Sequence, residues 1–199
     1  MNEEQDLNLA KIQTLAATST QTSYPAGYVS QFLMKDGTEV TLRPIGPEDE
    51  PLMAKFHETL SDRSVYMRYF CSLPLRTRVS HDRLVRICFV DYEEQIALVV
   101  DHQDKITGQH SILAVGRLMK VPAKDETEVA LLVSDRYQRQ GLGRELLRRA
   151  LEIARDKKLR RISAEMLRDN VAVLSIFKSA GFRLSPLADS SSIMAVLDL

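Results

Sequence analysis

A glycine-bearing turn between a strand pattern and a helix pattern is the part of the chain best suited to chemistry. It runs from Gln138 to Gly143 in the pattern Q-x-x-G-x-G, after the apolar run at 129–133. The first N–H groups of a helix have no partners inside it, and the helix dipole favours negative charge there. Gly141 and Gly143 lack a Cβ, so an anion can approach the backbone closely. The turn is therefore predicted to bind a phosphate group.

Two better-known phosphate motifs do not fit this turn. A P-loop needs Lys and then Ser or Thr after its last glycine, but Gly143 is followed by Arg144 and Glu145. A dinucleotide-binding turn needs a third glycine, and Leu146 stands at that position. An ordinary strand-to-helix turn with a glycine cap remains an alternative reading of the same residues.

Composition and charge restrict the class of protein. The chain has 199 residues, a size expected for one domain with or without a tail. It carries 27 basic and 27 acidic side chains, a balance that favours neither nucleic acid nor an acidic membrane as the main partner. No apolar run reaches the roughly 18 residues of a membrane span, and the acidic start lacks the basic region of a signal peptide.

The cysteines and histidines point to a metal-free protein of a reducing compartment. Cys71 and Cys88 stand apart in no disulfide or metal pattern, which predicts free thiols and a cytoplasmic location. The four histidines are too irregularly spaced for a local zinc site. They are His57, His81, His102 and His110.

The apolar patterns predict one domain over residues 24–199, after a flexible N-terminal tail at 1–23. Asp36-Gly37 between two apolar runs is a hairpin signal. Strands are expected at 28–34, 38–43, 95–101, 109–119, 126–134, 161–166, 182–184 and 193–197. Helices are expected at 48–60, 80–89, 142–157 and 171–180, and 61–74 reads as a loop. Strands that alternate with helices around a mixed sheet indicate an α/β or α+β domain.

This order of motifs resembles the GNAT superfamily of N-acetyltransferases. Residues 136–143 are similar to its acetyl-CoA pyrophosphate loop, and residues 170–182 to the segment that usually follows. The resemblance covers about 38–198. It implies a mixed, mostly antiparallel central sheet of about six to seven strands with splayed central strands, flanked by about four helices.

A narrower likeness lies upstream. Residues 42–51 and 60–70 look like the catalytic domain of bacterial protein lysine acetyltransferases of the Pat type. The likeness implies a protein substrate that presents a lysine ε-amine. Many such relatives carry large fused regulatory regions, for which 199 residues leave no room. Acetylation of a small amine or an α-amino group remains an alternative, and so does a non-catalytic acyl-CoA-binding module.

The resemblance also implies the site residues, with acetyl-CoA as co-substrate and no metal. The pantetheine would pair with backbone groups of the strand before the loop, and the loop N–H groups would hold the pyrophosphate. Asn170 would bond the cofactor or cap its helix, and Phe177 stands where many relatives carry a tyrosine acid. The predicted cofactor-binding residues are Leu131, Leu132, Val133, Gln138, Arg139, Gln140, Gly141, Leu142, Gly143, Arg144, Asn170 and Phe177.

A general base must accept the proton of the attacking amine, directly or through water. Glu128 is the candidate, because it matches the usual family glutamate in the strand before the loop. Glu126 shares its face by the two-residue period of a strand, and Glu165 lies at the end of the next strand. A solvated carboxylate at the strand edge is the alternative role for Glu128.

Overall fold

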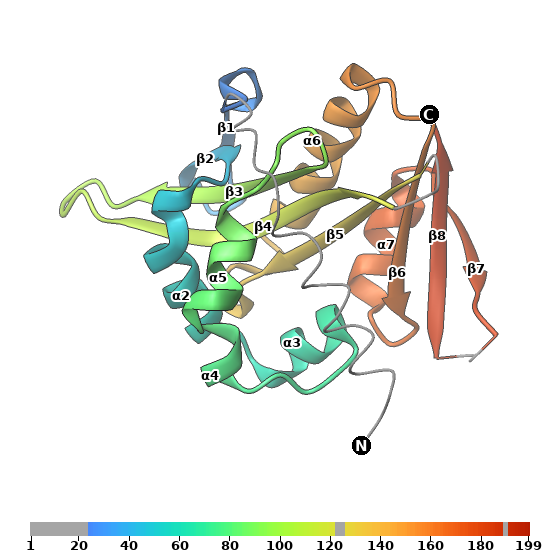
Figure 1. The fold of residues 1–199 in the computed structure, drawn as a ribbon, viewed down its shortest axis with the longest axis horizontal. Helices are drawn as coiled ribbons and strands as arrows, with labels where there is room; N and C mark the ends of the chain where they lie inside the picture. Colours follow the sequence, from blue (N-terminus) through green and yellow to red (C-terminus); the bar gives the residue numbers. More distant parts are fainter. Residues whose placement is uncertain (1–23, 122–125, 189–190) are drawn as a thin grey trace.

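The computed structural model describes residues 24–121, 126–188 and 191–199 (Figure 1). Within them one sheet holds eight strands in the order β1-β2-β3-β4-β5-β6-β8-β7. Its strands are β1 (Ser30–Leu33), β2 (Glu39–Pro44), β3 (Gln95–Gln103), β4 (His110–Lys120), β5 (Thr127–Val133), β6 (Arg161–Leu167), β7 (Arg183–Pro186) and β8 (Ser192–Asp198). Every neighbouring pair is antiparallel except β5 and β6, which run parallel.

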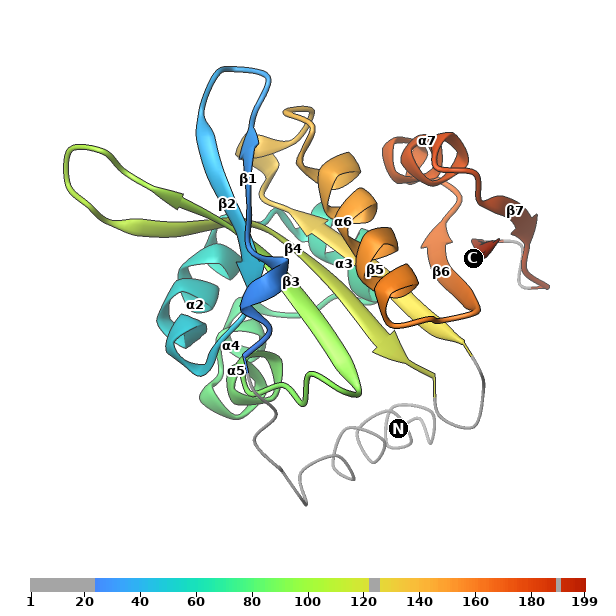
Figure 2. The ribbon, with the colours of Figure 1, turned by 90° about the horizontal axis from the view of Figure 1, so that it is seen from above.

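Helices cover both faces of this sheet (Figure 2). One face carries the helices between β2 and β3, which are α2 (Glu50–Glu58), α3 (Asp62–Tyr69), α4 (Leu75–Arg78) and α5 (His81–Cys88). The other face carries α6 (Leu142–Asp156) and α7 (Val171–Ser179). The two faces have separate apolar cores, so the domain has three layers.

Strand β3 shows how the sequence builds both cores at once. Its segment 96–100 is apolar without interruption because both of its faces are covered there. Ile96, Leu98 and Val100 belong to the core under α6, while Ala97 and Val99 belong to the core under α2–α5. Helix α6 completes the first core with an apolar stripe at helical spacing. Its buried apolar residues are Leu142, Leu146, Leu147, Ala150, Leu151, Ile153 and Ala154.

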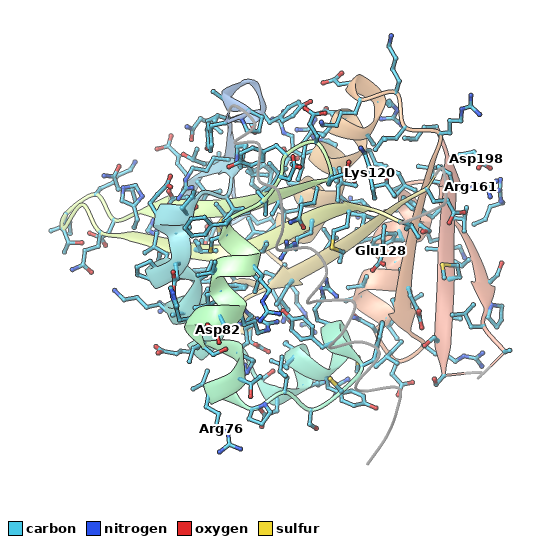
Figure 3. All side chains as sticks on the ribbon, viewed as in Figure 1. Arg76, Asp82, Lys120, Glu128, Arg161 and Asp198 are labelled. Carbon is cyan, nitrogen blue, oxygen red and sulfur yellow. The ribbon has the colours of Figure 1, made fainter. Side chains whose placement is uncertain are left out.

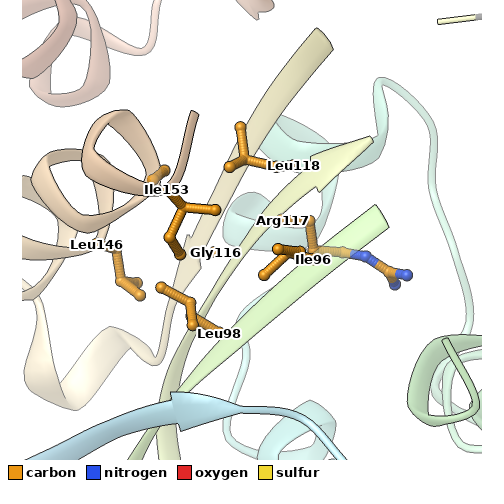
Figure 4. Close-up of a pocket in the computed structure, with 8 residues that line it drawn as sticks. Ile96, Leu98, Gly116, Arg117, Leu118, Leu146 and Ile153 are labelled. Carbon is orange, nitrogen blue, oxygen red and sulfur yellow. The ribbon is translucent and has the colours of Figure 1, made fainter. Parts of the chain in front are cut away.

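A small apolar packing gap lies between α6 and the sheet (Figure 4). Gly116 of β4 is the reason that α6 can approach here, because a Cβ at this position would lie 3.2 Å from Leu146 Cδ2. The gap is too small for a water molecule, so it belongs to the core and is not a ligand site. Its lining consists of Ile96, Leu98, Gly116, Arg117, Leu118, Leu146, Ala150 and Ile153.

An ion-pair network fastens the β2 strand to the start of α2. The Arg43 guanidinium donates to both carboxylate oxygens of Asp49, at 2.8 and 2.7 Å, and to Asp101 Oδ2 at 3.0 Å. Asp49 also accepts the Gly46 N–H at 2.8 Å. Because Asp49 is only 1% exposed, removing Arg43 would leave a buried charge without its partner. Arg43 and Asp49 in the Pat-like segment thus have a structural role.

The observed architecture confirms the predicted fold class, with three differences in detail. The sheet has eight strands, as many as the apolar patterns predicted, where the family resemblance implied about six to seven. The predicted loop at 61–74 instead contains α3, so the described residues hold more helices than the four expected. The turn between β3 and β4 falls after Gln103, where Asp104 accepts the N–H groups of Ile106 and Thr107. The predicted tail at 1–23 lies outside the described residues.

Candidate active site

The central strands β5 and β6 splay apart after a short parallel contact. They pair at only two positions, Thr127 with Ile162 and Glu128 with Ser163. On its other side β5 pairs with β4 over its whole length, from Lys120–Thr127 to Ala114–Val133. From 129 to 133, therefore, β5 has a free edge within the described part of the chain, where the two ribbons diverge in Figure 1.

The register decides which backbone groups this free edge offers. The Ser134 N–H bonds Leu113 O at 2.9 Å and the Val121 N–H bonds Glu126 O at 2.9 Å, so even-numbered residues of β5 turn their backbone groups toward β4. In an antiparallel pair such residues alternate with residues that point away. The N–H and C=O groups of Leu131 and Val133 consequently face the splay. Those of Leu132 are turned to β4, which speaks against its backbone as a partner of the pantetheine.

The turn after β5 presents a row of free donors. Within the part of the chain that the structure describes, the six N–H groups from Arg139 to Arg144 donate no hydrogen bond. The first bond inside the helix is from Glu145 N to Gly141 O, at 3.0 Å. Gly141 has φ +95° and Arg139 has φ +64°, and these left-handed conformations curl the chain before α6. A run of N–H groups at a helix N-terminus is suited to a phosphate.

Neighbouring elements hold this turn in place. The Lys35 N–H in the β1–β2 hairpin donates to Gln140 O at 3.3 Å. A Cβ at position 141 would lie 3.3 Å from Phe32 Cζ, and one at position 143 would lie 3.2 Å from Ile176 Cδ1. Both glycines are therefore packed by other elements, and Gly141 also needs its positive φ. The patterning of the sequence did not reveal these contacts.

A carboxylate joins the phosphate turn to α3 on the opposite side. Asp135 accepts hydrogen bonds from Ser61 N at 2.8 Å, Ser61 Oγ at 2.7 Å and Ser64 Oγ at 2.8 Å. Gln138 Nε2 adds a bond to Ser64 Oγ at 3.2 Å. Partial burial raises the pKa of Asp135, but the hydrogen bonds from Ser61 and Ser64 lower it more, so the net pKa lies below its usual value. The N-terminus of α3 is thereby tied to the residues that follow β5.

Glu128 lies at the apex of the splay. It is half-buried, and its side chain makes no hydrogen bond or ion pair with any residue that the structure describes. The faces of β5 are fixed by Leu131 and Val133, which pack against the α6 core, and by Leu132, which packs against the core under α2–α5. By alternation the Glu128 side chain shares the face of Leu132. Its carboxylate therefore has no partner among the described residues.

The two rival glutamates lie on the same face in different surroundings. Glu126 Oε1 is 3.5 Å from Arg161 Nη1, so its carboxylate already has a cationic partner. Glu165 is exposed on β6, beyond the last position at which β6 pairs with β5. The geometry thus favours Glu128 among the three carboxylates.

The structural surroundings of other predicted site residues limit which of their groups are available to bind a cofactor. Asn170 caps α7, since its Oδ1 accepts from Val173 N at 3.4 Å. Phe177 is 1% exposed and stacks edge-on against Phe182, with ring centroids 4.8 Å apart. That burial speaks against a contact between the Phe177 ring and a bound cofactor. Leu142 is also buried in the core, so only its backbone N–H is available. Arg139 and Arg144 are exposed beside the turn.

Two further features of the described residues bear on the class of protein. No group of three or more histidine, cysteine, aspartate or glutamate side chains is gathered there as metal ligands would be. Across the same residues no helix is both long enough and apolar enough to cross a membrane.

A splayed sheet beside a row of free N–H groups at a helix N-terminus defines a domain built to bind an acyl-CoA. The sequence model of the acetyltransferase (GNAT) domain family matches residues 39–183. The chain belongs to this family, and it is an N-acetyltransferase that uses acetyl-CoA.

Known proteins similar to this chain are acetyltransferases. The solved GNAT domain of S. lividans PAT is 28% identical, with a TM-score of 0.76, over 89% of this chain and 100% of that one. An acetyltransferase of Pseudomonas aeruginosa is 25% identical over 75% of this chain and 77% of its own length. Mycobacterium smegmatis RimJ, solved in complex with CoA-disulfide, shares the fold at 14% identity, with a TM-score of 0.66 over 85% of this chain and 86% of that one.

Proposed function

We propose that the protein acetylates lysine ε-amino groups of other proteins, with Glu128 as general base. The observation that carries this proposal is the position of Glu128 at the last paired residue before the splay, with its carboxylate free. The lysine acceptor is supported by the Pat-like segments at 42–51 and 60–70 and by the similarity to the GNAT domain of S. lividans PAT. The free cysteines favour action in the cytoplasm.

Backbone groups would do most of the work of holding acetyl-CoA. The N–H groups from Arg139 to Arg144 would bind the pyrophosphate, and the exposed Arg139 and Arg144 side chains would add positive charge. The outward-facing groups of Leu131 and Val133 would pair with the pantetheine amides, as an added strand pairs with a sheet edge. This arrangement would bring the thioester to the start of the splay, beside Glu128.

The chemical step needs alignment, removal of a proton and stabilisation of an oxyanion. A lysine ammonium has a free pKa of about 10.4, so Glu128 accepts its proton directly or through water. The neutral amine attacks the thioester carbonyl, a carbon–nitrogen bond forms, and a free N–H of β5 stabilises the developing negative charge. The carbon–sulfur bond then breaks. Because the buried Phe177 cannot donate a proton, the thiolate leaves as such and takes its proton from water.

The experiment is transfer from labelled acetyl-CoA to a panel of proteins, peptides and small amines. Acetylation of protein or peptide lysines, with products located by mass spectrometry, is the expected result. Transfer only to small amines or only to α-amino groups would overturn the choice of acceptor. Tight binding of acetyl-CoA with no transfer to any amine would identify an acyl-CoA-binding regulatory module instead.

A further inference from the structure

Three arginines gather on the same face of the sheet as Glu128, and we call Arg68, Arg83 and Arg117 the arginine cluster. Arg68 and Arg83 lie against the Tyr69 ring, with their guanidinium carbons 5.2 and 5.0 Å from its centroid. Arg117 is close enough to both arginines for their charges to act on its own. The three residues come from α3, α5 and β4, so only the folded chain brings them together.

The charge of the cluster is not balanced within the described residues. None of the three arginines forms an ion pair with a carboxylate there, although nine other lysine and arginine side chains do. Arg117 Nη2 donates only to the neutral Gln95 Oε1, at 2.8 Å, and its Nε is buried without a hydrogen-bond partner. Arg83 Nη1 lies 3.4 Å from His57 Nε2 and from Arg78 O, which are also uncharged acceptors.

Such a cluster is costly for the folded protein. Burial, and then the charge of Arg68, lower the pKa of Arg117 to about 10, so the guanidinium still carries its charge at neutral pH. Like charges that are half-buried together repel one another more strongly than they would in water. An anionic group that binds the folded protein would relieve this repulsion. Guanidinium groups bind carboxylates well because their planar donors match the two oxygens.

The register places this cluster next to the reaction centre. Arg117 pairs with Ala130 and Met119 pairs with Glu128, so Arg117 and Glu128 are diagonal neighbours on one face of the sheet. Diagonal neighbours across an antiparallel pair are roughly 7 Å apart. Alternate side chains of an extended peptide are separated by roughly the same distance, about 6.6 Å. One bound segment can therefore place an amine at Glu128 and a second side chain at the cluster.

We propose that the arginine cluster binds an acidic side chain of the acceptor, so that the enzyme prefers lysines with a glutamate or aspartate within about two residues. This inference rests on the proposed acetylation of protein lysines. It adds a specificity determinant that is made by Arg68, Arg83 and Arg117 and is separate from the acetyl-CoA site.

The test compares kcat/KM for matched peptides. Each pair has one lysine flanked by glutamate, or by glutamine at the same position, one or two residues to either side. For the wild-type enzyme we expect the best glutamate peptide to exceed its glutamine partner by about tenfold, as for a hydrogen-bonded charge pair. The ratio should fall as salt is added. Equal kcat/KM for every pair would overturn the inference.

Variants separate recognition from folding. Arg68→Gln should bring the ratio close to one while acetylation of the glutamine peptide continues. Arg68→Glu should reverse the preference, toward peptides with arginine at the same positions. Arg76→Gln is the matched control, because Arg76 lies exposed on α4 outside the cluster and should keep the wild-type ratio (Figure 3). An unchanged ratio in both Arg68 variants, with normal thermal unfolding, would also overturn the inference.

The same assay distinguishes this inference from the proposed function. If glutamine peptides are acetylated without any preference for glutamate, the proposed function stands and the inference fails. If no peptide is acetylated but small amines are, the protein substrate is wrong. The inference is then tested by comparing kcat/KM for pairs of small amines that differ only in the presence of a carboxylate. Equal values within every pair would overturn it.

Discussion

Glu128 pairs with Ser163 at the last position where β5 and β6 lie side by side. Within the described residues β5 has a free edge from the next residue to Val133. Eight residues after Val133, at Gly141, the turn has led into the N-terminus of α6. The proposed base and the N–H groups proposed to bind the pyrophosphate therefore belong to opposite ends of one short segment. This separation makes their roles accessible to independent substitution.

Replacing the proposed base should affect turnover and not binding. Glu128→Gln keeps the shape of the side chain but removes its proton-accepting charge. We expect kcat to fall by about 10²- to 10⁴-fold near neutral pH, the usual range for a general base. The acetyl-CoA Kd from calorimetry should stay near that of the wild type. Glu126→Gln and Glu165→Gln are the matched controls. A comparable loss in either control, or a parallel loss of binding in Glu128→Gln, would contradict the assignment.

The phosphate turn should depend on Gly141 for more than its backbone conformation. Gly141→Ala forces a left-handed conformation on alanine and brings its Cβ to 3.3 Å from Phe32 Cζ. We expect the affinity for acetyl-CoA to fall at least about tenfold, since the N–H groups lose their alignment. Gly108→Ala has a similar backbone strain, with φ +69°, but meets open space in the β3–β4 hairpin. It should lose some thermal stability while its acetyl-CoA Kd stays unchanged; equal affinities in the two variants would refute the prediction.

The hydrogen bonds that Asp135 accepts from Ser61 and Ser64 of the α3 N-terminus, which we call the Asp135 clamp, should make an acid-sensitive contribution to the stability of the protein. The pKa of Asp135 is lower in the folded protein, so the carboxylate stabilises the fold above its unfolded pKa of about 3.9. That contribution is lost as the pH falls through the lower folded value. Asp135→Asn should reduce the free energy of unfolding at pH 7 by up to about 1 kcal/mol, as for exposed hydrogen bonds.

Urea unfolding at several pH values checks this prediction. The difference between wild type and Asp135→Asn should be constant near neutrality and should shrink below about pH 4. Asp82→Asn, on the exposed face of α5 (Figure 3), removes a carboxylate that has no such clamp and should behave like the wild type. A difference that persists unchanged to pH 2 would mean that the Asp135 carboxylate is not responsible.

His57 should make a second contribution with the same sign at higher pH. It is 1% exposed, and burial, followed by the charges of Arg83 and Arg78, lowers its pKa to about 3. Between pH 6.5 and 3 the unfolded chain binds a proton here that the folded protein does not. The free energy of unfolding should therefore fall as the pH is lowered, by up to about 1.4 kcal/mol per pH unit from this residue.

The variant His57→Gln should remove this part of the pH dependence, whatever it does to stability at pH 7. His81 offers a control of opposite sign, because a hydrogen bond to Glu50 raises its pKa. His81→Gln should lower stability below the unfolded pKa, where the charged histidine is favoured, and this difference should disappear as the pH rises through the raised folded pKa. The slope of unfolding free energy against pH is the measurement. An unchanged slope in His57→Gln would contradict the buried neutral histidine.

The sequence predicted the elements that are stabilised mainly by burial of their own regularly spaced apolar residues. Helix α6 has a continuous apolar stripe and β3 a continuous apolar run, so both were found at nearly their observed bounds. Helix α3 was read as a loop because it buries only Val65. Its N-terminus depends on Asp135, more than 70 residues away in the chain. Ser61 followed by Asp62 was the local capping signal that could have revealed it.

The site was predictable to a similar extent and for the same reason. The Q-x-x-G-x-G spacing identifies the phosphate turn, since a helix N-terminus is a local feature. Which residues of β5 turn outward depends on the register with β4, so Leu131 and Val133 could not be separated from Leu132 in advance. The arginine cluster could not be predicted from the sequence either, because its three members come from elements that are far apart in the chain. The roles of the individual site residues stay predictions until they are tested.

The donors from Arg139 to Arg144 belong to the main chain, which no substitution other than proline removes. Under the proposed function, most side chains on this turn can therefore be substituted while the binding of acetyl-CoA is retained, provided that the left-handed conformation at Gly141 is kept. The proposed acceptor side includes Arg68 of α3 and Arg83 of α5, two elements inserted between β2 and β3. Under the proposed function, such a protein would change its acceptor mainly by altering that insertion, while the segment proposed to bind acetyl-CoA stays as it is.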